Sequence, residues 1–209
     1  MNLYPFGRAI SYPFVRFVFK MRYEGLEHIP QCGGYILACN HRSNFDPIIL
    51  AHKIPLHVRY LAKAELVKNR FFGFIMKGLG IIPVKRGEGD TGALESAAEV
   101  IHSGGVLGMF PEGKRSKDGV PLRPRSGTAL IAGQTGADIL PVAISYSKGV
   151  RFRGPVTVRF GPLIPNDQLG VSLESPATVR VASKLIMGNI ISLMDPTPGQ
   201  LPEPGEGEA

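Results

Sequence analysis

The stretch NHRSNFD, at residues 40–46, lies between two apolar segments, YILA at 35–38 and IILA at 48–51. The first segment has the length and composition of a buried strand. The second follows Asp46-Pro47 and is typical of a helix with proline at its first position. We therefore expect His41 on a loop at the carboxyl end of a strand, where α/β proteins place their chemistry.

His41 and Asp46 are five residues apart, which suits a contact across a tight turn better than a shared helix face. The carboxylate can then accept a hydrogen bond from one imidazole nitrogen, which fixes the tautomer and leaves the other nitrogen available as a base. The alternative is structural: the pair arises by chance, and Asp46 caps the helix that begins at Pro47.

A protein nucleophile is missing from the sequence motifs. There is no GxSxG elbow, and the two cysteines, Cys32 and Cys39, have no defined partner. This suggests that the attacking group belongs to the substrate, such as a hydroxyl deprotonated by His41. Cys39 invites an acyl-cysteine hypothesis, although a small buried residue is the simpler interpretation. We predict no metal, because no cluster has metal-ligand spacing.

A second block strengthens the case for a site. The segment VLGMF at 106–110 reads as another buried strand, and it is followed by the charged turn PEGKRSKDG. The ends of the two strands are expected to meet at one edge of a sheet, and packing alone does not explain why both carry charged turns.

With these blocks the sequence resembles the glycerolipid acyltransferase family, and within it the bacterial 1-acylglycerol-3-phosphate acyltransferases. Four segments match the family motifs in order: NHRSNFD at 40–46, GIIPVKRG at 80–87, FPEGKRS at 110–116 and LPVAISY at 140–146. Four ordered motifs are far more specific than any one of them. Lys114 departs from the threonine that the family often has.

The resemblance implies a reaction. An acyl thioester, either acyl-CoA or acyl carrier protein, would donate its acyl group to the sn-2 hydroxyl of 1-acyl-sn-glycerol 3-phosphate, giving phosphatidic acid for phospholipid synthesis. His41 would be the base and Asp46 its orienting partner, with direct attack, no acyl-enzyme and no cofactor beyond the thioester co-substrate.

The resemblance also implies a substrate-binding set made of Arg86, Glu112, Gly113 and Arg115. The arginines would bind phosphate, since guanidinium offers paired donors. Glu112 would accept from a hydroxyl or position the arginines, and amides around Gly113 are candidates for the oxyanion hole. The structural alternatives are a surface ion pair for Glu112 and a solvated loop cation for Arg86.

Other functions stay open on the sequence alone. Within the enzyme class, the alternative acceptors are glycerol 3-phosphate and another lysolipid. A hydrolase would use His41 to activate water on a thioester or lipid. A noncatalytic membrane-binding module would rely only on its basic and amphipathic segments.

Residues 1–24 are expected to form an amphipathic helical segment that associates with membrane. Apolar side chains fall at helical spacing, and cations follow among them, which suits an anionic membrane surface; they are Phe6, Ile10, Phe14, Phe17, Arg8, Arg16, Lys20 and Arg22. A core helix packing its aromatic face on the sheet is the alternative, and Pro13 argues against one uninterrupted helix.

Membrane attachment is expected to be peripheral. The longest uncharged run, residues 28–41, has 14 residues, which is too few to span a bilayer. Residues 1–24 lack the features of a signal peptide. With a net charge of +7, the chain suits the cytoplasmic, anionic face of the cell membrane.

Length and composition predict a single globular domain, at 25–195. The apolar strand and helix patterns, together with the family resemblance, predict an α/β fold with a mixed, mostly parallel sheet flanked by helices. We expect an edge strand at 157–165, a helix at 71–80, an exposed amphipathic helix at 90–104 and a disordered acidic tail at 196–209. Five cations crowd residues 114–125 without interleaved aromatics, which favours a lipid head group, coenzyme A phosphates or acidic carrier protein over nucleic acid.

Overall fold

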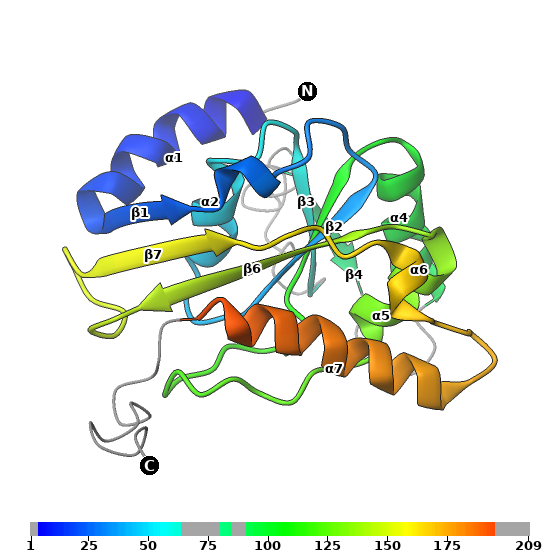
Figure 1. Cartoon of the computed structure of the whole chain (residues 1–209). Helices are drawn as coiled ribbons and strands as arrows, with labels where there is room; N and C mark the ends of the chain where they lie inside the picture. The colour runs from blue at the N-terminus through cyan, green and yellow to red at the C-terminus, as the bar shows by residue number, and fades with distance from the viewer. Residues whose placement is uncertain (1–3, 64–79, 85–90, 195–209) are drawn as a thin grey trace, which may run out of the picture.

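The computed structural model describes residues 4–63, 80–84 and 91–194, which form one α/β domain around a seven-stranded sheet (Figure 1). The strands are β1 (Lys20–Glu24), β2 (Tyr35–Cys39), β3 (Val58–Lys63), β4 (Ile81–Val84), β5 (Val106–Met109), β6 (Ile139–Tyr146) and β7 (Pro155–Phe160). Their order across the sheet is β1-β7-β6-β2-β5-β3-β4. Neighbouring strands are parallel except β6 and β7. The predicted fold class, a mostly parallel mixed sheet, is confirmed.

Helices cover both faces of the sheet (Figure 1). They are α1 (Tyr4–Val18), α2 (Asp46–Ala51), α4 (Thr91–His102), α5 (Gly127–Thr135), α6 (Asn166–Leu169) and α7 (Pro176–Ser192), with a short 3-10 helix, η1 (Leu26–His28). Side chains of α1 and α2 share one apolar core with one face of the sheet, and those of α4, α5 and α7 share a second core with the other. Within the described residues, no helix combines the length and apolarity needed to span a membrane.

Strand β2 explains why the sequence at 35–39 is apolar without alternation. All five of its residues are buried. Leu37 and Cys39 face the core under α1 and α2, whereas Ile36 and Ala38 face the core under α4, α5 and α7. A strand between two helical layers has no solvent face, so every position is apolar.

The polarity of the strands determines which loops lie together. Strands β2, β5 and β6 are parallel, so their carboxyl ends share one edge of the sheet. Strand β7 runs antiparallel to β6, and β1 is parallel to β7. The beginnings of β1 and β7 therefore lie at that same edge, beside the loops that follow β2, β5 and β6.

The prediction of an edge strand at 157–165 is wrong. β7 lies between β6 and β1, and β1 takes the outer position through a parallel register that begins at Lys20 and Pro155. The sequence around Lys20 suggested a continuing helix because its cations follow the helical pattern. Instead the chain leaves the helix after Val18 and adds a strand to the sheet, so only part of 1–24 is helical.

Helix α1 runs through Pro13 without interruption, contrary to our expectation. Proline removes one backbone hydrogen bond, and tertiary contacts hold the helix on both sides of it. Arg8 donates to the carbonyls of Ile54 (2.9 Å) and His52 (2.8 Å), and Val15 is fully buried. One face of α1 therefore packs on the domain through Tyr4 and Val15. The aromatic face that the alternative interpretation placed against the sheet is instead exposed, with Phe6 at 67% and Phe17 at 63%.

One further predicted helix is present in the structure, and two other predicted elements fall on residues that it does not describe. The helix expected at 90–104 is α4, which is not simply exposed, because Ala97 and Val100 are buried in the core. The helix expected at 71–80 and the tail at 196–209 lie outside the described residues, apart from Gly80.

Candidate active site

The loop after β2 brings His41 and Asp46 into direct contact. His41 Nδ1 lies 2.8 Å from Asp46 Oδ2. The same oxygen accepts hydrogen bonds from the backbone amides of Arg42 and Ser43, both at 2.7 Å. Because this oxygen is an acceptor in all three contacts, the proton belongs on Nδ1 and the neutral imidazole presents Nε2 as its basic nitrogen.

Asp46 is fully buried, and its second oxygen is also occupied. The hydroxyl of Tyr146, at the end of β6, donates to Asp46 Oδ1 at 2.6 Å. Burial raises the pKa of Tyr146, and the nearby charge of Asp46 raises it further, so the tyrosine remains a protonated donor. Four hydrogen bonds thus hold the carboxylate in one orientation.

Asp46 is the first residue of α2, with Pro47 after it, but its side chain does not cap that helix. Its backbone partners, Arg42 and Ser43, precede it in the loop, and Phe45 at the cap position makes no side-chain cap bond. The purely capping interpretation of Asp46 therefore does not match the structure. The carboxylate instead shapes the loop that carries His41.

The His41 ring is held but remains accessible. It stacks on Phe110, the residue after β5, with ring centroids 4.0 Å apart and an interplanar angle of 19°. Its side chain is 18% exposed. Among the described residues, no partner occupies Nε2, so the arrangement can accept a proton from a bound molecule.

Glu112 lies behind His41 rather than on the surface. One carboxylate oxygen accepts from the His41 backbone amide and the other from the Leu122 amide, each at 2.9 Å. The residue is 2% exposed, which does not fit a surface ion pair. Burial raises the pKa of Glu112, and the two amide hydrogen bonds oppose that shift. Its contacts are those of a group that fixes the loops around His41.

Gly113 and Arg115 differ from Glu112 in position. Gly113 has a φ of 70°, a left-handed backbone conformation that favours glycine over residues with a side chain. Its amide donates to the Phe110 carbonyl at 2.9 Å and is not available as an oxyanion donor. Arg115 is exposed next to the site. Arg86 lies outside the described residues.

All five cations of the basic segment 114–125 are exposed, whereas hydrogen bonds of Ser116 fix the backbone of the segment. Ser116 donates its amide to the His41 carbonyl at 2.8 Å, and its hydroxyl bonds the Val120 carbonyl at 2.7 Å. The five cations are Lys114, Arg115, Lys117, Arg123 and Arg125. A concentrated positive potential therefore lies beside His41, which favours anionic ligands.

Two residues that matter for the site were not singled out from the sequence. Asn40 is buried, and its side-chain amide pairs with both backbone groups of Ile144, at 3.0 and 2.8 Å. It extends the contact between β2 and β6 beyond the backbone ladder. Tyr146 is the second. Both lie inside segments that match family motifs, NHRSNFD at 40–46 and LPVAISY at 140–146, but a motif does not reveal a partner about a hundred residues away.

No group of three or more histidine, cysteine, aspartate or glutamate side chains is placed to hold a metal ion in the part of the chain that the structure describes. The nucleophilic side chains nearest His41 in sequence are Cys39 and Ser43, and both are buried. Burial raises the pKa of the Cys39 thiol well above its usual range.

The fold and this histidine–aspartate loop define a known class: the chain belongs to the acyltransferase family, whose model matches residues 20–145. Among curated relatives, the 1-acyl-sn-glycerol-3-phosphate acyltransferase of Bacillus subtilis is 31% identical over 118 residues, which cover 56% of this chain and 58% of the relative. The protein of that name from Streptococcus pneumoniae is 30% identical over 166 residues, covering 78% and 58%.

A solved structure is also similar. The crystal structure of the 1-acyl-sn-glycerophosphate (LPA) acyltransferase PlsC from Thermotoga maritima matches with a TM-score of 0.69 and 25% identity, over 88% of this chain and 76% of that chain. The present chain spans 58% of the length of each of the two curated relatives named above. The matched family region contains His41, Asp46 and Glu112.

Proposed function

We propose that the protein transfers a fatty acyl group from an acyl thioester to the sn-2 hydroxyl of 1-acyl-sn-glycerol 3-phosphate, giving phosphatidic acid. The observation that carries this proposal is the His41–Asp46 contact of 2.8 Å, at the sheet edge and inside the region matched by the acyltransferase family. The names of the relatives favour this acceptor over glycerol 3-phosphate and other lysolipids.

The proposed chemistry begins with proton removal. The acceptor hydroxyl donates to His41 Nε2, and the oxygen attacks the thioester carbonyl as its proton moves to the imidazole. The buried Asp46 carboxylate stabilises the imidazolium through Nδ1. Collapse of the tetrahedral intermediate breaks the carbon–sulfur bond, and the thiolate leaves with a proton from His41.

Direct transfer without an acyl-enzyme is supported by the environment of the nearby nucleophiles. Cys39 is fully buried and its thiol has a raised pKa, so the reactive thiolate is disfavoured. Ser43 is buried, and its hydroxyl oxygen accepts the Phe45 amide at 3.2 Å. Among the described contacts, Cys39 pairs with Asn40 and Ser43 with Phe45 rather than with the His41 ring, which favours the substrate hydroxyl as the attacking group.

The basic segment is proposed to bind phosphate. Arg115 is one of the two exposed cations of the third motif, beside Lys114, and Arg86 is proposed as its partner on the acceptor phosphate. The remaining cations of 114–125 suit the phosphates of coenzyme A or the acidic surface of a carrier protein. Glu112 is proposed to act through His41 as a positioning residue, because its two oxygens already accept backbone amides.

Peripheral association with the cytoplasmic face of the cell membrane completes the proposal. Four apolar side chains of α1 are more than half exposed: Phe6, Ile10, Phe14 and Phe17. We call them the α1 apolar stripe. An apolar stripe of this size beside cations suits the interface of an anionic bilayer, where the lipid acceptor resides.

The test measures thiol release from a long-chain acyl-CoA by purified protein in detergent micelles, with and without 1-acyl-sn-glycerol 3-phosphate. We expect release that requires the acceptor and yields phosphatidic acid. His41→Ala should lower kcat by about a thousandfold, in the range typical for loss of a general base. His102→Ala, at the exposed end of α4, is the matched control and should retain activity.

The assay separates the other functions. Release of free fatty acid without acceptor would identify a hydrolase instead. Transfer to glycerol 3-phosphate but not to the lysolipid would correct the acceptor. Absence of turnover with acyl-CoA and with acyl carrier protein donors, by a folded protein that binds vesicles, would refute the enzymatic proposal.

A further inference from the structure

The loop between β6 and β7 exposes apolar side chains that no other part of the described structure covers. Residues 147–153 are all exposed, and they include Val150 at 45% and Phe152 at 63%. The same seven residues carry Lys148, Arg151 and Arg153. Exposed apolar side chains flanked by cations are typical of a segment that inserts into a lipid interface.

This loop is joined to the α1 apolar stripe. Phe152 packs edge-to-face on Phe17, with ring centroids 5.5 Å apart and an interplanar angle of 62°. Both rings remain 63% exposed despite this contact. Two aromatic side chains from positions 135 residues apart therefore form one continuous apolar surface.

The loop is fixed to the end of α1 rather than loosely placed beside it. Arg153 adopts a left-handed conformation with φ of 56°, which is uncommon for a residue other than glycine. In this conformation its amide donates to the Val18 carbonyl at 2.6 Å, and its guanidinium donates to the Phe17 carbonyl at 3.3 Å. Both bonds satisfy carbonyls at the carboxyl end of the helix, where a cation is favourable.

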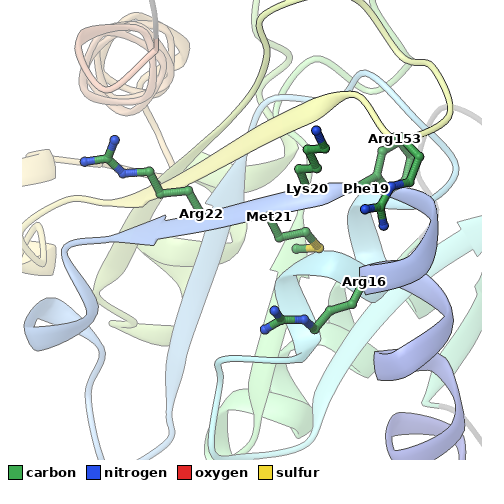
Figure 2. A pocket seen from close by; sticks show the side chains of 6 residues that line it. All are labelled: Arg16, Phe19, Lys20, Met21, Arg22 and Arg153. Carbon is green, nitrogen blue, oxygen red and sulfur yellow. The ribbon is translucent and has the colours of Figure 1, made fainter.

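Cations surround this junction. Figure 2 shows the side chains of Arg16, Lys20, Arg22 and Arg153, which line a hollow at the start of β1. The volume of this hollow is about 420 Å³. Arg22 pairs with Glu24 at 2.8 Å, and Glu24 also binds Arg159. Among the residues that the structure describes, none of those lining the hollow is acidic. The junction therefore offers positive charge next to exposed aromatic rings.

The junction lies on the side of the domain that holds His41. The beginnings of β1 and β7 share the sheet edge with the ends of β2 and β6. Phe45, in the loop between His41 and Asp46, contacts the α1 region through Phe14 and Phe19, at centroid distances of 6.3 and 5.4 Å. A bilayer bound at this junction would lie next to the site.

We propose that the β6–β7 loop is a second lipid-contact element, which binds an anionic bilayer together with α1 and turns the His41 edge of the sheet toward it. Val150 and Phe152 enter the interface, and the cations of the junction bind lipid phosphates. The inference rests on the proposed function, because it extends the membrane association proposed for α1 alone.

The first experiment measures partition onto vesicles of phosphatidylcholine with phosphatidylglycerol, by flotation, without substrates. A Val150→Ser, Phe152→Ser double variant should lose at least about tenfold in partition coefficient, because two apolar contacts are removed. The matched control is Leu173→Ser with Val181→Ser, which changes two equally exposed apolar residues away from the junction and should bind like wild type. Wild-type binding should fall at high salt and on pure phosphatidylcholine.

A second measurement keeps the inference testable whatever the double variant does to folding. The chain contains no tryptophan, so Phe152→Trp provides a single fluorescent probe. We expect its emission to shift to the blue on anionic vesicles and to be quenched by lipids brominated on their acyl chains. Val181→Trp, on α7, should show neither effect.

Vesicle binding by the loop variant that equals wild type, or a Phe152→Trp signal that brominated lipids leave unchanged, would overturn the inference. Loss of binding in a Phe14→Ser, Phe17→Ser variant alone would then assign membrane contact to α1 only. Failure of the proposed reaction is seen separately, because acyl transfer is measured in detergent micelles and does not require vesicle binding.

Discussion

Replacing Tyr146 by phenylalanine tests whether the hydroxyl that holds Asp46 matters for chemistry. The substitution removes one oxygen atom and leaves the ring, so packing against Phe19, at a centroid distance of 5.8 Å, is retained. What is lost is a buried hydrogen bond of 2.6 Å to the Asp46 carboxylate. No other residue supplies a donor to that oxygen among the described contacts.

The expected loss of kcat in Tyr146→Phe can be estimated from the strength of the hydrogen bond that is removed. A hydrogen bond to a charged group contributes about 1.5–3 kcal/mol, more than one between neutral groups. If the whole of this stabilisation is expressed when His41 becomes an imidazolium, kcat falls by about 10- to 150-fold, since 1.4 kcal/mol is a factor of ten. Tyr146 is only 5% exposed and its hydroxyl donates to Asp46, so KM should change little.

The assay is acceptor-dependent thiol release, run beside a matched control. Tyr60→Phe also removes a buried tyrosine hydroxyl, but one that donates to the neutral Pro47 carbonyl at 3.1 Å. We expect the control to lose about 1 kcal/mol of stability and less than about threefold in kcat. The two variants should therefore differ in kcat by more than their difference in stability accounts for.

A double-mutant cycle provides the refutation. In an Asp46→Asn background the charged acceptor is gone, so adding Tyr146→Phe should have little further effect on kcat. Equal kcat losses for Tyr146→Phe and Tyr60→Phe, or effects of Tyr146→Phe and Asp46→Asn that simply multiply, would show that the hydroxyl does not act through Asp46.

Three further predictions concern the framework of the site. Asn40→Ala leaves both backbone groups of Ile144 buried without their side-chain partner, so the free energy of unfolding in urea should fall by about 2–5 kcal/mol. Asn44→Ala, at an exposed position in the same loop, is the control and should lower it by less than about 0.5 kcal/mol. Glu112→Gln should lower kcat and should lower stability by about 1–3 kcal/mol, because the glutamine side chain can accept a hydrogen bond from only one of the two backbone amides that the carboxylate binds. Glu99→Gln, at an exposed position, is the control. A Glu112→Gln variant that is active and fully stable would contradict the positioning role. Burial and the neighbouring cation Arg8 lower the pKa of His52 from 6.5 to about 4, so the stability that His52 contributes is complete above pH 6.5 and is lost as the pH falls toward 4. The melting temperature of His52→Gln should therefore depend less on pH between 6.5 and 4 than that of wild type. The same pH dependence in both proteins would exclude His52 as its source.

The site illustrates which kinds of residue a sequence can reveal. His41 and Asp46 were found because both partners lie in one short loop after an apolar strand, and a local turn is enough to join them. Glu112 was found by its motif, but its position was not. A carboxylate in a charged turn usually faces water, and only the packing of that turn against the His41 loop buries it between two amides.

The sequence predicted which segments form buried strands but not the order of the strands in the sheet. The apolar composition of 35–39 and 139–146 indicated buried strands, because a strand between two helical layers has no polar face. Position in the sheet depends instead on pairing between segments distant in sequence. The segment 20–24 carries the cations of a helix pattern, yet it pairs with 155–159 and displaces β7 from the edge.

The sequence by itself therefore determined the α/β class, the two strand ends that meet, and the His41–Asp46 contact, since each depends on local hydrophobic pattern or on residues a few positions apart. The tertiary structure decided the rest: the Tyr146 and Asn40 contacts, the burial of Glu112, the continuity of α1 through Pro13, and the meeting of Phe17 with Phe152. These are contacts between segments far apart in the chain. Their geometry depends on how helices and strands pack together, which the pattern within one segment does not specify.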